Sequence, residues 1–380
     1  MMLVLVAMLL QVEPEIPTVR VLVQSGKSAT VECRGAVTVA KPGAAKPLVV
    51  ITKLTENEIA LVDGRFKFLG RLFDEPWLTI EGRDPEQPVK LSGGRSYAGQ
   101  LHVVRDGASF LVVSEVDLET YLYGVVGSEI GPGSPYDAMK VQAVCARSYA
   151  IASMGGVPRA GQKRATYDLF DDTRSQVYVG VPAANANLKR AIRETAGVCV
   201  QWKKDVVKTY FSSSCGGHTM GVKEWTGGAE VPPLSGVACG FCEGVPNGRW
   251  TVKATLAELT KKLRSRTGER ELARVSVAKR TESGRVAEVL LEARDGKRIE
   301  MTGEAFVDAC GGRNRMFAIK LDGESLVLEG RGYGHGVGMC QYGAIGMAQK
   351  GKAWEEILAH YFPQATVAPV YGPALKKARP

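Results

Sequence analysis

Residues 17 to about 120 place the tightest limit on the fold, because they consist largely of short apolar or alternating segments separated by Gly, Asp and Pro. Segments such as TVRVLVQ, SATVECRG, PLVVITKL, WLTIEG and SFLVVSEV have the length and the β-branched content of strands. The turn residues between them are typical of hairpin connections. The sequence therefore predicts a string of short, hairpin-like strands over this region.

Helical patterns follow the β region. The segment 134–154 repeats apolar residues at helical spacing, with Ser134 as an N-cap and Pro135 in the first turn. A second helix is expected over about 185–196, opening at Asn185. The predicted fold class is α+β: a mixed, largely antiparallel β core with a few packed helices and a small inserted β-rich lobe.

The N-terminal sequence MMLVLVAMLLQVEPEIP begins with about eleven uncharged residues, the length of a signal-peptide apolar region. No Lys or Arg precedes this run, and no clear small-x-small cleavage site follows it. A truncated signal peptide, a mis-assigned start and a first strand are the interpretations that this pattern leaves open. We favour export.

The formal net charge of +9 suits a polyanionic partner, such as nucleic acid or an anionic cell-wall polymer. A nucleic-acid interface, however, needs the charge gathered on one face or in a run, with aromatic residues between the basic ones. The basic residues here are scattered. The sequence therefore argues against a nucleic-acid partner and is compatible with an acidic substrate.

The four candidate metal ligands occur in two short motifs, CGGH at 215–218 and CGFC at 239–242. Two pairs, each with two intervening residues, can chelate one tetrahedral ion, and three thiolates with one imidazole favour Zn²⁺. With no open position such a site is structural. A disulfide between Cys239 and Cys242, or unrelated buried thiols, are the alternatives. The expected ligands are Cys215, His218, Cys239 and Cys242.

The glycine-rich segment GYGHGVGMCQYGA at 332–344 leaves His335 and Gln341 as polar groups that could face a ligand. It lacks the Lys-Ser/Thr ending of a phosphate-binding loop. A buried structural histidine in a glycine-rich turn is the alternative interpretation.

A carboxylate stands out in VVGSEIGPGSPYDAMKVQAVCARSYA, residues 125–150, where Glu129 lies between apolar residues and a Gly-Pro-Gly loop. Such a position suits an ion pair, a cap or a catalytic acid. On the following helix, Lys140 and Arg147 are seven residues apart and so share a face. If that face lines a cleft, it could bind the oxygens of a polar or acidic polymer.

Together with YDLFDDTRSQVYVG, TYFSSSCGGHT and GRGYGHGVGMCQYGAIGMAQKGKAWEEILAHYFP, this segment resembles the stage II sporulation protein D family, whose domain also occurs in the amidase enhancer of cell-wall lysis. The resemblance covers about residues 18–367, with the motif blocks in family order. One departure is Gly338-Met339-Cys340-Gln341, where the family commonly has Gly-Met-Ser-Gln. This change puts any role for a hydroxyl at residue 340 in doubt.

The resemblance implies a peptidoglycan lytic transglycosylase that cleaves the β-1,4 bond between MurNAc and GlcNAc and leaves a 1,6-anhydro end. It places the catalytic acid/base at Glu129. Apolar neighbours should raise the pKa of this carboxyl group, whereas nearby basic groups and the N-terminus of the following helix act in the opposite direction. The resemblance also agrees with zinc in the Cys/His region. The residues that it implies for glycan binding or its support are Lys140, Arg147, Gln176, Tyr210, Ser213, His335 and Gln341.

The implied partners are peptidoglycan glycan strands and a peptidoglycan amidase or other wall hydrolase, and the implied location is the cell envelope of an exported protein. A non-catalytic, wall-binding amidase enhancer is the main alternative, and a zinc hydrolase would need an open metal position. The expected organisation is a signal or anchor segment (1–16), a β-rich part (17–120), a catalytic core with the zinc loop (121–245), a lobe (246–329), the glycine-rich motif with a C-terminal helix (330–367) and a tail (368–380).

Overall fold

The computed structural model describes residues 15–84, 86–158, 162–181, 185–246 and 248–372. Most of the expected signal segment (residues 1–14) and of the expected tail (373–380) lies outside these ranges. The chain divides into two compact units. The first comprises Met1–Pro132, Ala146–Cys199 and Val367–Pro380, and the second Gly133–Cys145 and Val200–Thr366.

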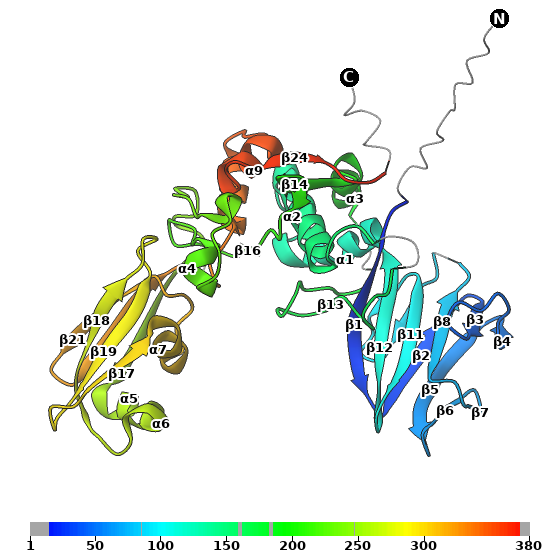
Figure 1. Ribbon diagram of the computed structural model, residues 1–380, viewed down its shortest axis with the longest axis horizontal. Helices are drawn as coiled ribbons and strands as arrows, with labels where there is room; N and C mark the ends of the chain where they lie inside the picture. Colours follow the sequence, from blue (N-terminus) through cyan, green and yellow to red (C-terminus); the bar gives the residue numbers. More distant parts are fainter. Residues whose placement is uncertain (1–14, 85, 159–161, 182–184, 247, 373–380) are drawn as a thin grey trace, which may run out of the picture. The chain divides into compact units, whose positions relative to one another are not determined.

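The first unit contains two β-sheets built almost entirely of antiparallel pairs (Figure 1). One has the order β13 (Leu169–Phe170), β1 (Thr18–Gly26), β12 (Ser109–Asp117), β11 (Gln100–Asp106), β8 (Trp77–Gly82), β3 (Val37–Ala40) and β4 (Val49–Ile51). The other has the order β10 (Ser96–Tyr97), β9 (Val89–Leu91), β2 (Ser28–Cys33), β5 (Leu54–Val62), β6 (Arg65–Phe68) and β7 (Arg71–Phe73).

Alternating burial shows why these segments form sheets. Val19 and Val21 of β1 are fully buried, and the residues between and beside them are half-buried. The same alternation on the other sheet turns its apolar side chains inward, and the rings of Phe66 and Phe110, one from each sheet, have centroids 6.1 Å apart. Apolar side chains from the two sheets therefore form a common core.

Helix α1 (Leu118–Ile130) follows β12 without a loop. It begins there because the Asp117 side chain accepts a hydrogen bond from the N–H of Thr120, 2.9 Å away. Its buried residues, among them Leu118, Leu122 and Val125, recur at helical spacing. This helix was missing from our sequence prediction, which treated the segment as an apolar run. The unit also contains α3 (Ala186–Glu194), capped by Asn185 as predicted.

Three elements include a residue at which the chain passes from one unit to the other. They are α2 (Tyr136–Ser153), β14 (Val198–Trp202) and β24 (Thr366–Pro369). The first of these confirms the helix predicted over 134–154. The strands β14 and β24 belong to a small sheet with the order β15 (Asp205–Val206), β14, β24.

The second unit brings two motifs of the sequence side by side. Strand β16 (Phe211–Ser212) pairs in parallel with β23 (Met339–Cys340), so the CGGH and glycine-rich motifs become neighbours. Helix α8 (Gln341–Gln349) begins inside the glycine-rich segment, where no helix was predicted, and α9 (Trp354–Tyr361) confirms the expected last helix. Shorter elements are α4 (Val222–Thr226) and the 3-10 turn η1 (Pro232–Leu234).

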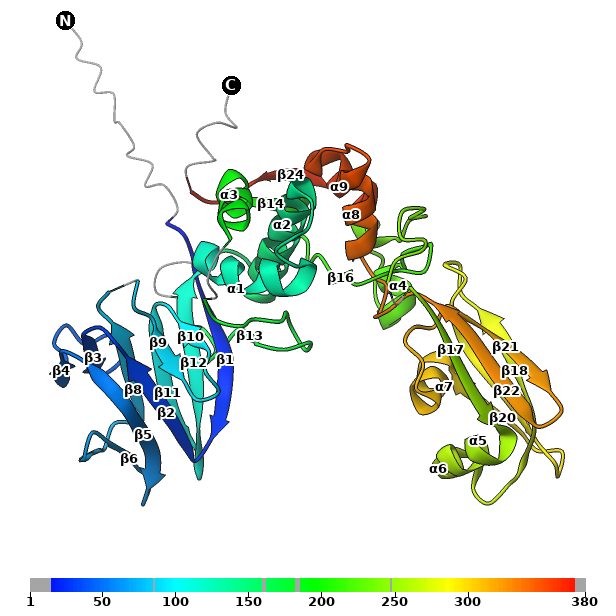
Figure 2. The same cartoon turned by 180° about the vertical axis from the view of Figure 1, so that it is seen from behind.

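A lobe within the second unit spans Arg249–Arg331 and has helices on one face of its strands (Figure 1, Figure 2). Its sheets have the orders β17 (Arg249–Thr255), β22 (Ser325–Arg331), β21 (Phe317–Asp322) and β18 (Leu272–Arg280), β19 (Val286–Ala293), β20 (Arg298–Thr302). The helices are α5 (Leu256–Lys262), α6 (Arg264–Thr267) and α7 (Gly303–Cys310). Leu259, Val289, Phe306 and Leu328 lie in one apolar cluster of the lobe.

The mixed helices and mostly antiparallel sheets confirm the predicted α+β class. Among the described residues, no helix has the length and apolar character needed to cross a bilayer.

Candidate functional site

Glu129 lies in the last turn of α1, half-buried. Its helical neighbours three and four positions earlier, Val126 and Val125, are fully buried. Its Oε1 accepts a hydrogen bond of 2.8 Å from the N–H of Val177. The carbonyl end of the helix disfavours a negative charge there, whereas the Val177 N–H favours it. The carboxyl group is therefore held in a fixed orientation under opposing electrostatic influences.

The segment 176–180 reaches Glu129 because Gly124 of α1 has no side chain. A Cβ at residue 124 would lie 2.0 Å from the carbonyl oxygen of Gly180 and 2.7 Å from the ring of Tyr178. The Tyr178 ring is buried and lies 4.9 Å from that of Tyr121 on α1. Close packing of this segment on α1 thus brings the Val177 N–H to Glu129.

Gln176 was predicted to bind substrate, but its side chain is 1% exposed. Its Nε2 donates to the hydroxyl of Tyr121 and to the carbonyl of Ala146, each at 3.3 Å. Both partners belong to the interior of the first unit. The structure therefore makes Gln176 a support for the neighbouring Val177 and not a surface that a glycan could reach.

Arg147 is likewise buried, with 0% of its surface exposed. Its Nε and Nη2 donate to the two carboxylate oxygens of Glu119, at 2.9 and 2.7 Å. Glu119 also accepts hydrogen bonds from the N–H of Gly197 and the hydroxyl of Tyr371. Although burial opposes ionisation, Arg147 and these hydrogen bonds lower the pKa of Glu119. Of the two roles expected for Arg147, glycan binding and support, its burial leaves support.

Lys140 precedes Arg147 on α2 but belongs to the second unit. It is half-buried, and its Nζ lies 4.7 Å from the centre of the Tyr136 ring, one helical turn earlier. Unlike Arg147, Lys140 keeps part of its side chain at the surface. Its role in glycan binding therefore stays a prediction.

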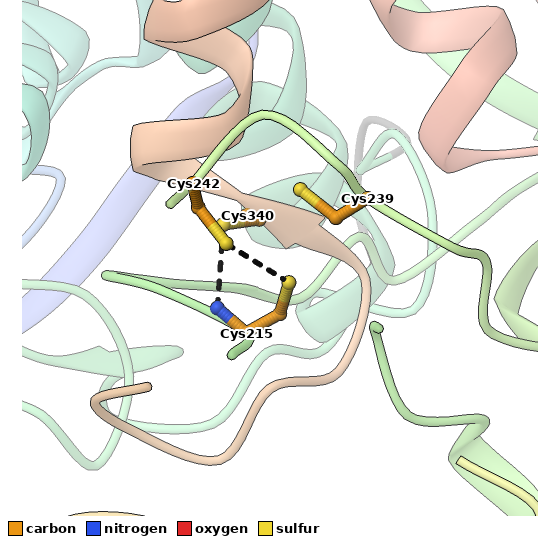
Figure 3. Close-up of side chains that lie close together, drawn as sticks. All are labelled: Cys215, Cys239, Cys242 and Cys340. Carbon is orange, nitrogen blue, oxygen red and sulfur yellow. Dashed lines mark hydrogen bonds between the residues drawn. The ribbon is translucent and has the colours of Figure 1, made fainter. Parts of the chain in front are cut away.

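The second unit gathers four buried cysteines, Cys215, Cys239, Cys242 and Cys340, whose sulfurs all lie within 4.8 Å of one another (Figure 3). Cys215 and Cys242 have sulfurs 3.6 Å apart, too far for a disulfide. Tetrahedral coordination with metal–sulfur bonds of about 2.3 Å places sulfurs about 3.8 Å apart. The spacing of the four thiols therefore fits one metal ion.

This donor set corrects the predicted Cys₃His site. His218 does not belong to the group of neighbouring metal-ligating atoms, which contains only the four cysteines. Its Nδ1 lies 2.6 Å from the carbonyl oxygen of Thr219, to which it donates. Cys340 takes the fourth position. Its sulfur accepts hydrogen bonds of 3.3 Å from the N–H groups of Cys215 and Gly343, the latter at the start of α8.

His335 was predicted to contact a ligand, and the structure engages both of its ring nitrogens with the backbone. Nε2 donates to the carbonyl of Phe211 at 2.9 Å, and Nδ1 accepts from the N–H of Val337 at 3.0 Å. Burial lowers its pKa. The ring stacks on Trp225 at 5.0 Å. These contacts describe a neutral histidine that holds the glycine-rich segment, the alternative that the sequence left open.

Tyr210 lies in the same aromatic group, 5.1 Å from Trp225, with burial raising its pKa. Gln341, the first residue of α8, is 8% exposed, and its Nε2 donates to Gln142. Ser213 is half-buried, and its carbonyl accepts from the N–H of Tyr342. These three residues lie in the second unit, together with Lys140, His335 and the cysteines, whereas Glu129, Arg147 and Gln176 lie in the first.

Sequence reasoning did not find Cys340, Trp225 or Arg285, which contacts the cysteine loop. For Cys340 a signal existed, since it was the position at which the sequence departed from the pattern that it resembles. No local pattern marks Trp225 or Arg285.

Comparison with known proteins supports a single family. The model of a family described as stage II sporulation protein matches residues 106–202, and that of a domain of unknown function matches residues 243–338. An uncharacterized protein of Brachyspira hyodysenteriae is 32% identical over 82% of this chain and 83% of its own length.

Two relatives carry descriptive names. Stage II sporulation protein D of Bacillus subtilis is 28% identical over 66% of this chain and 74% of its own length. The amidase enhancer of the same species is 26% identical over 65% of this chain, but over only 40% of its own length. The chain therefore belongs to the family of stage II sporulation protein D and the amidase enhancer.

Proposed function

We propose that this protein is a lytic transglycosylase that cleaves the β-1,4 bond between MurNAc and GlcNAc in peptidoglycan, with Glu129 as its acid/base. The observation that carries the proposal is the placement of Glu129: half-buried, oriented by Val177 and backed by buried valines at the end of α1. Membership of the sporulation D family supports it.

One carboxyl group can serve both steps of this reaction. Protonated Glu129 gives its proton to the glycosidic oxygen as the bond to C1 of MurNAc breaks. The resulting carboxylate then accepts the proton of the C6 hydroxyl of the same sugar while the C6 oxygen bonds to C1. The products are a 1,6-anhydro end and a free hydroxyl on the leaving sugar, and Glu129 regains its proton. A glycoside hydrolase generally needs a second carboxylate, either as the base that activates water or as the nucleophile that attacks C1.

Glu129→Gln tests this role, because the amide oxygen can still accept the Val177 hydrogen bond but the side chain cannot transfer the proton. We expect the rate of 1,6-anhydro product formation, measured by mass spectrometry on glycan strands with and without stem peptides, to fall at least about 100-fold. Glu58→Gln, at an exposed carboxylate on β5 of the same unit, serves as the control and should retain activity. Equal activity of wild type and Glu129→Gln would exclude the assignment.

The relative named amidase enhancer favours a second candidate, a wall-binding protein without cleavage activity of its own. In that case wild type and Glu129→Gln bind glycan equally, neither produces anhydro ends, and both stimulate a peptidoglycan amidase. Either function would place the protein at the cell envelope, with glycan strands and other wall hydrolases as partners.

We also propose that Cys215, Cys239, Cys242 and Cys340 hold a structural Zn²⁺. The support is the chemistry of the donors, since four thiolates suit Zn²⁺ and occupy every tetrahedral position. The ion would fix the 215–242 loop against β23 and would take no part in bond cleavage. Metal analysis of the purified protein should give one zinc per chain.

A further inference from the structure

Arg285, which directly precedes β19 in the lobe, is a fully buried cation, with 0% of its surface exposed. Its Nη2 donates to the carbonyl of Cys215 and its Nη1 to the carbonyl of His218, both at 2.9 Å. One side chain of the lobe thus hydrogen-bonds to both ends of the CGGH motif. Gly336 of the glycine-rich segment leaves the space, because a Cβ there would lie 2.1 Å from Nη2.

The positive charge of Arg285 contacts no carboxylate directly. Its Nη1 also donates to the hydroxyl of Ser283, which donates in turn to Glu224, so the nearest acid is one hydroxyl away. Arg315 opposes the effect of Glu224. An arginine guanidinium stays charged at neutral pH even when it is buried. A buried charge with so little direct compensation is costly and calls for a counter-charge.

The cysteine cluster can supply that counter-charge. Arg285 interacts electrostatically with Cys215 and Cys340, so negative charge on either sulfur stabilises the guanidinium. Four neutral thiols offer none. Four thiolates around a divalent ion carry a net charge of −2, which is opposite in sign to the charge of the Arg285 guanidinium. The buried cation and the cysteine cluster are therefore complementary only when the cluster is anionic.

We propose that Arg285 is a positioning residue for the metal centre, which holds the Cys215 loop through its two carbonyl contacts and balances the charge of the tetrathiolate. This inference rests on the proposed metal site. It gives the lobe a function that neither the family nor the domain match assigns: the lobe retains the metal. Partners outside the ligand shell commonly change metal affinity by about 10–100-fold.

The test compares the zinc affinity of wild type, Arg285→Met and Arg285→Lys in the full chain, by competition with a chromogenic chelator. Arg285→Met keeps the length of the side chain but removes the charge and both carbonyl contacts. We expect it to bind zinc about 10–100-fold more weakly. Arg285→Lys keeps the charge and should recover most of the loss.

Arg280→Met is the matched control, because Arg280 also belongs to the lobe and donates to two carbonyls, those of Gly284 and Phe317, both at 2.9 Å. Its zinc affinity should equal that of wild type. The free energy of unfolding in urea, measured for each variant with and without zinc, separates a role in holding the metal from a role in the stability of the fold. The proposal is wrong if Arg285→Met destabilises the zinc-free and the zinc-bound protein equally and leaves the zinc affinity unchanged. It is also wrong if Arg285→Met does not fold with or without zinc and Arg285→Lys does not bind zinc. Failure of wild type itself to bind zinc would instead reject the metal site.

Discussion

The two units each contain a buried arginine, but the groups that contact its charge differ. In the first, Arg147 and Glu119 form a two-pronged ion pair whose remaining oxygen contacts come from Gly197 and Tyr371. In the second, Arg285 donates only to carbonyl and hydroxyl oxygens. The first arrangement is complete within the protein, whereas the second would be completed by the metal centre that we propose at the neighbouring cysteines.

Because the Arg147 pair is complete, breaking it should be costly. Arg147→Met leaves the Glu119 carboxylate buried without its cation, and we expect the free energy of unfolding to fall by about 3–5 kcal/mol in urea titrations. Lys140→Met, seven residues earlier on α2, should cost less than about 1 kcal/mol. Adding Glu119→Gln to the Arg147 variant should restore part of the loss, since it removes the uncompensated charge. Similar losses for Arg147→Met and Lys140→Met would show that the pair contributes little.

At the scale of elements, the contact of α1 with the 176–180 segment sets the position of the candidate acid. Alanine usually stabilises a helix by about 1 kcal/mol relative to glycine. Gly124→Ala should nevertheless destabilise the protein by about 1–3 kcal/mol, because its Cβ would meet the backbone oxygen of Gly180 at 2.0 Å. It should also lower the proposed transglycosylase activity, since Val177 moves away from Glu129.

Gly127→Ala is the control on the same helix. Its Cβ would meet only the flexible end of Leu188, at 3.2 Å, which can shift. Thermal unfolding should therefore show it to be as stable as wild type or more so. If both variants behave alike, the packing of the segment on α1 does not determine the position of Glu129.

Local patterns were enough to predict several of the elements. The strands of 17–120, the capped helix at Asn185 and the last helix all followed from spacing and turn residues. Helix α1 was missed, although Asp117 and the apolar repeat from Leu118 carried a usable signal. Its direct continuation from β12 hid the change from strand to helix periodicity.

The sites were harder to predict because their residues meet only through tertiary pairing. Cys340 reaches the other cysteines through the parallel pair of β16 and β23, which no local pattern announces. The burial of Arg147 and Gln176 depends on partners far along the chain, which neither helical spacing nor the resemblance that implied a binding or supporting role could show. Glu129 was identified through the resemblance, and the structure added the element that holds it.

At the scale of the whole molecule, the lobe has the features of an independent folding unit. An apolar cluster of its own joins its helices and both sheets, and its first and last strands pair along their whole length. Residues 248–332 expressed alone should therefore fold cooperatively, with a stability on the order of 5 kcal/mol, measured by circular dichroism on heating.

The isolated lobe also allows a control on the role of Arg285. Cys215 and His218 are missing from that fragment, so Arg285→Met should leave its melting temperature nearly unchanged. A fragment that stays unfolded would show that the lobe requires the rest of the second unit.

The place of the lobe in the chain also has a kinetic consequence. Three of the clustered cysteines precede the lobe, and Cys340 follows it, so almost a hundred residues separate Cys242 from Cys340. Arg249 and Arg331 are directly paired across β17 and β22, which brings the two ends of the folded lobe together. If the lobe folds first, the effective loop between Cys242 and Cys340 becomes about sixfold shorter, and the entropic free energy of closing it falls by about 1.6 kcal/mol. During synthesis, the four cysteines of the proposed metal site are therefore expected to assemble last, after the lobe has formed.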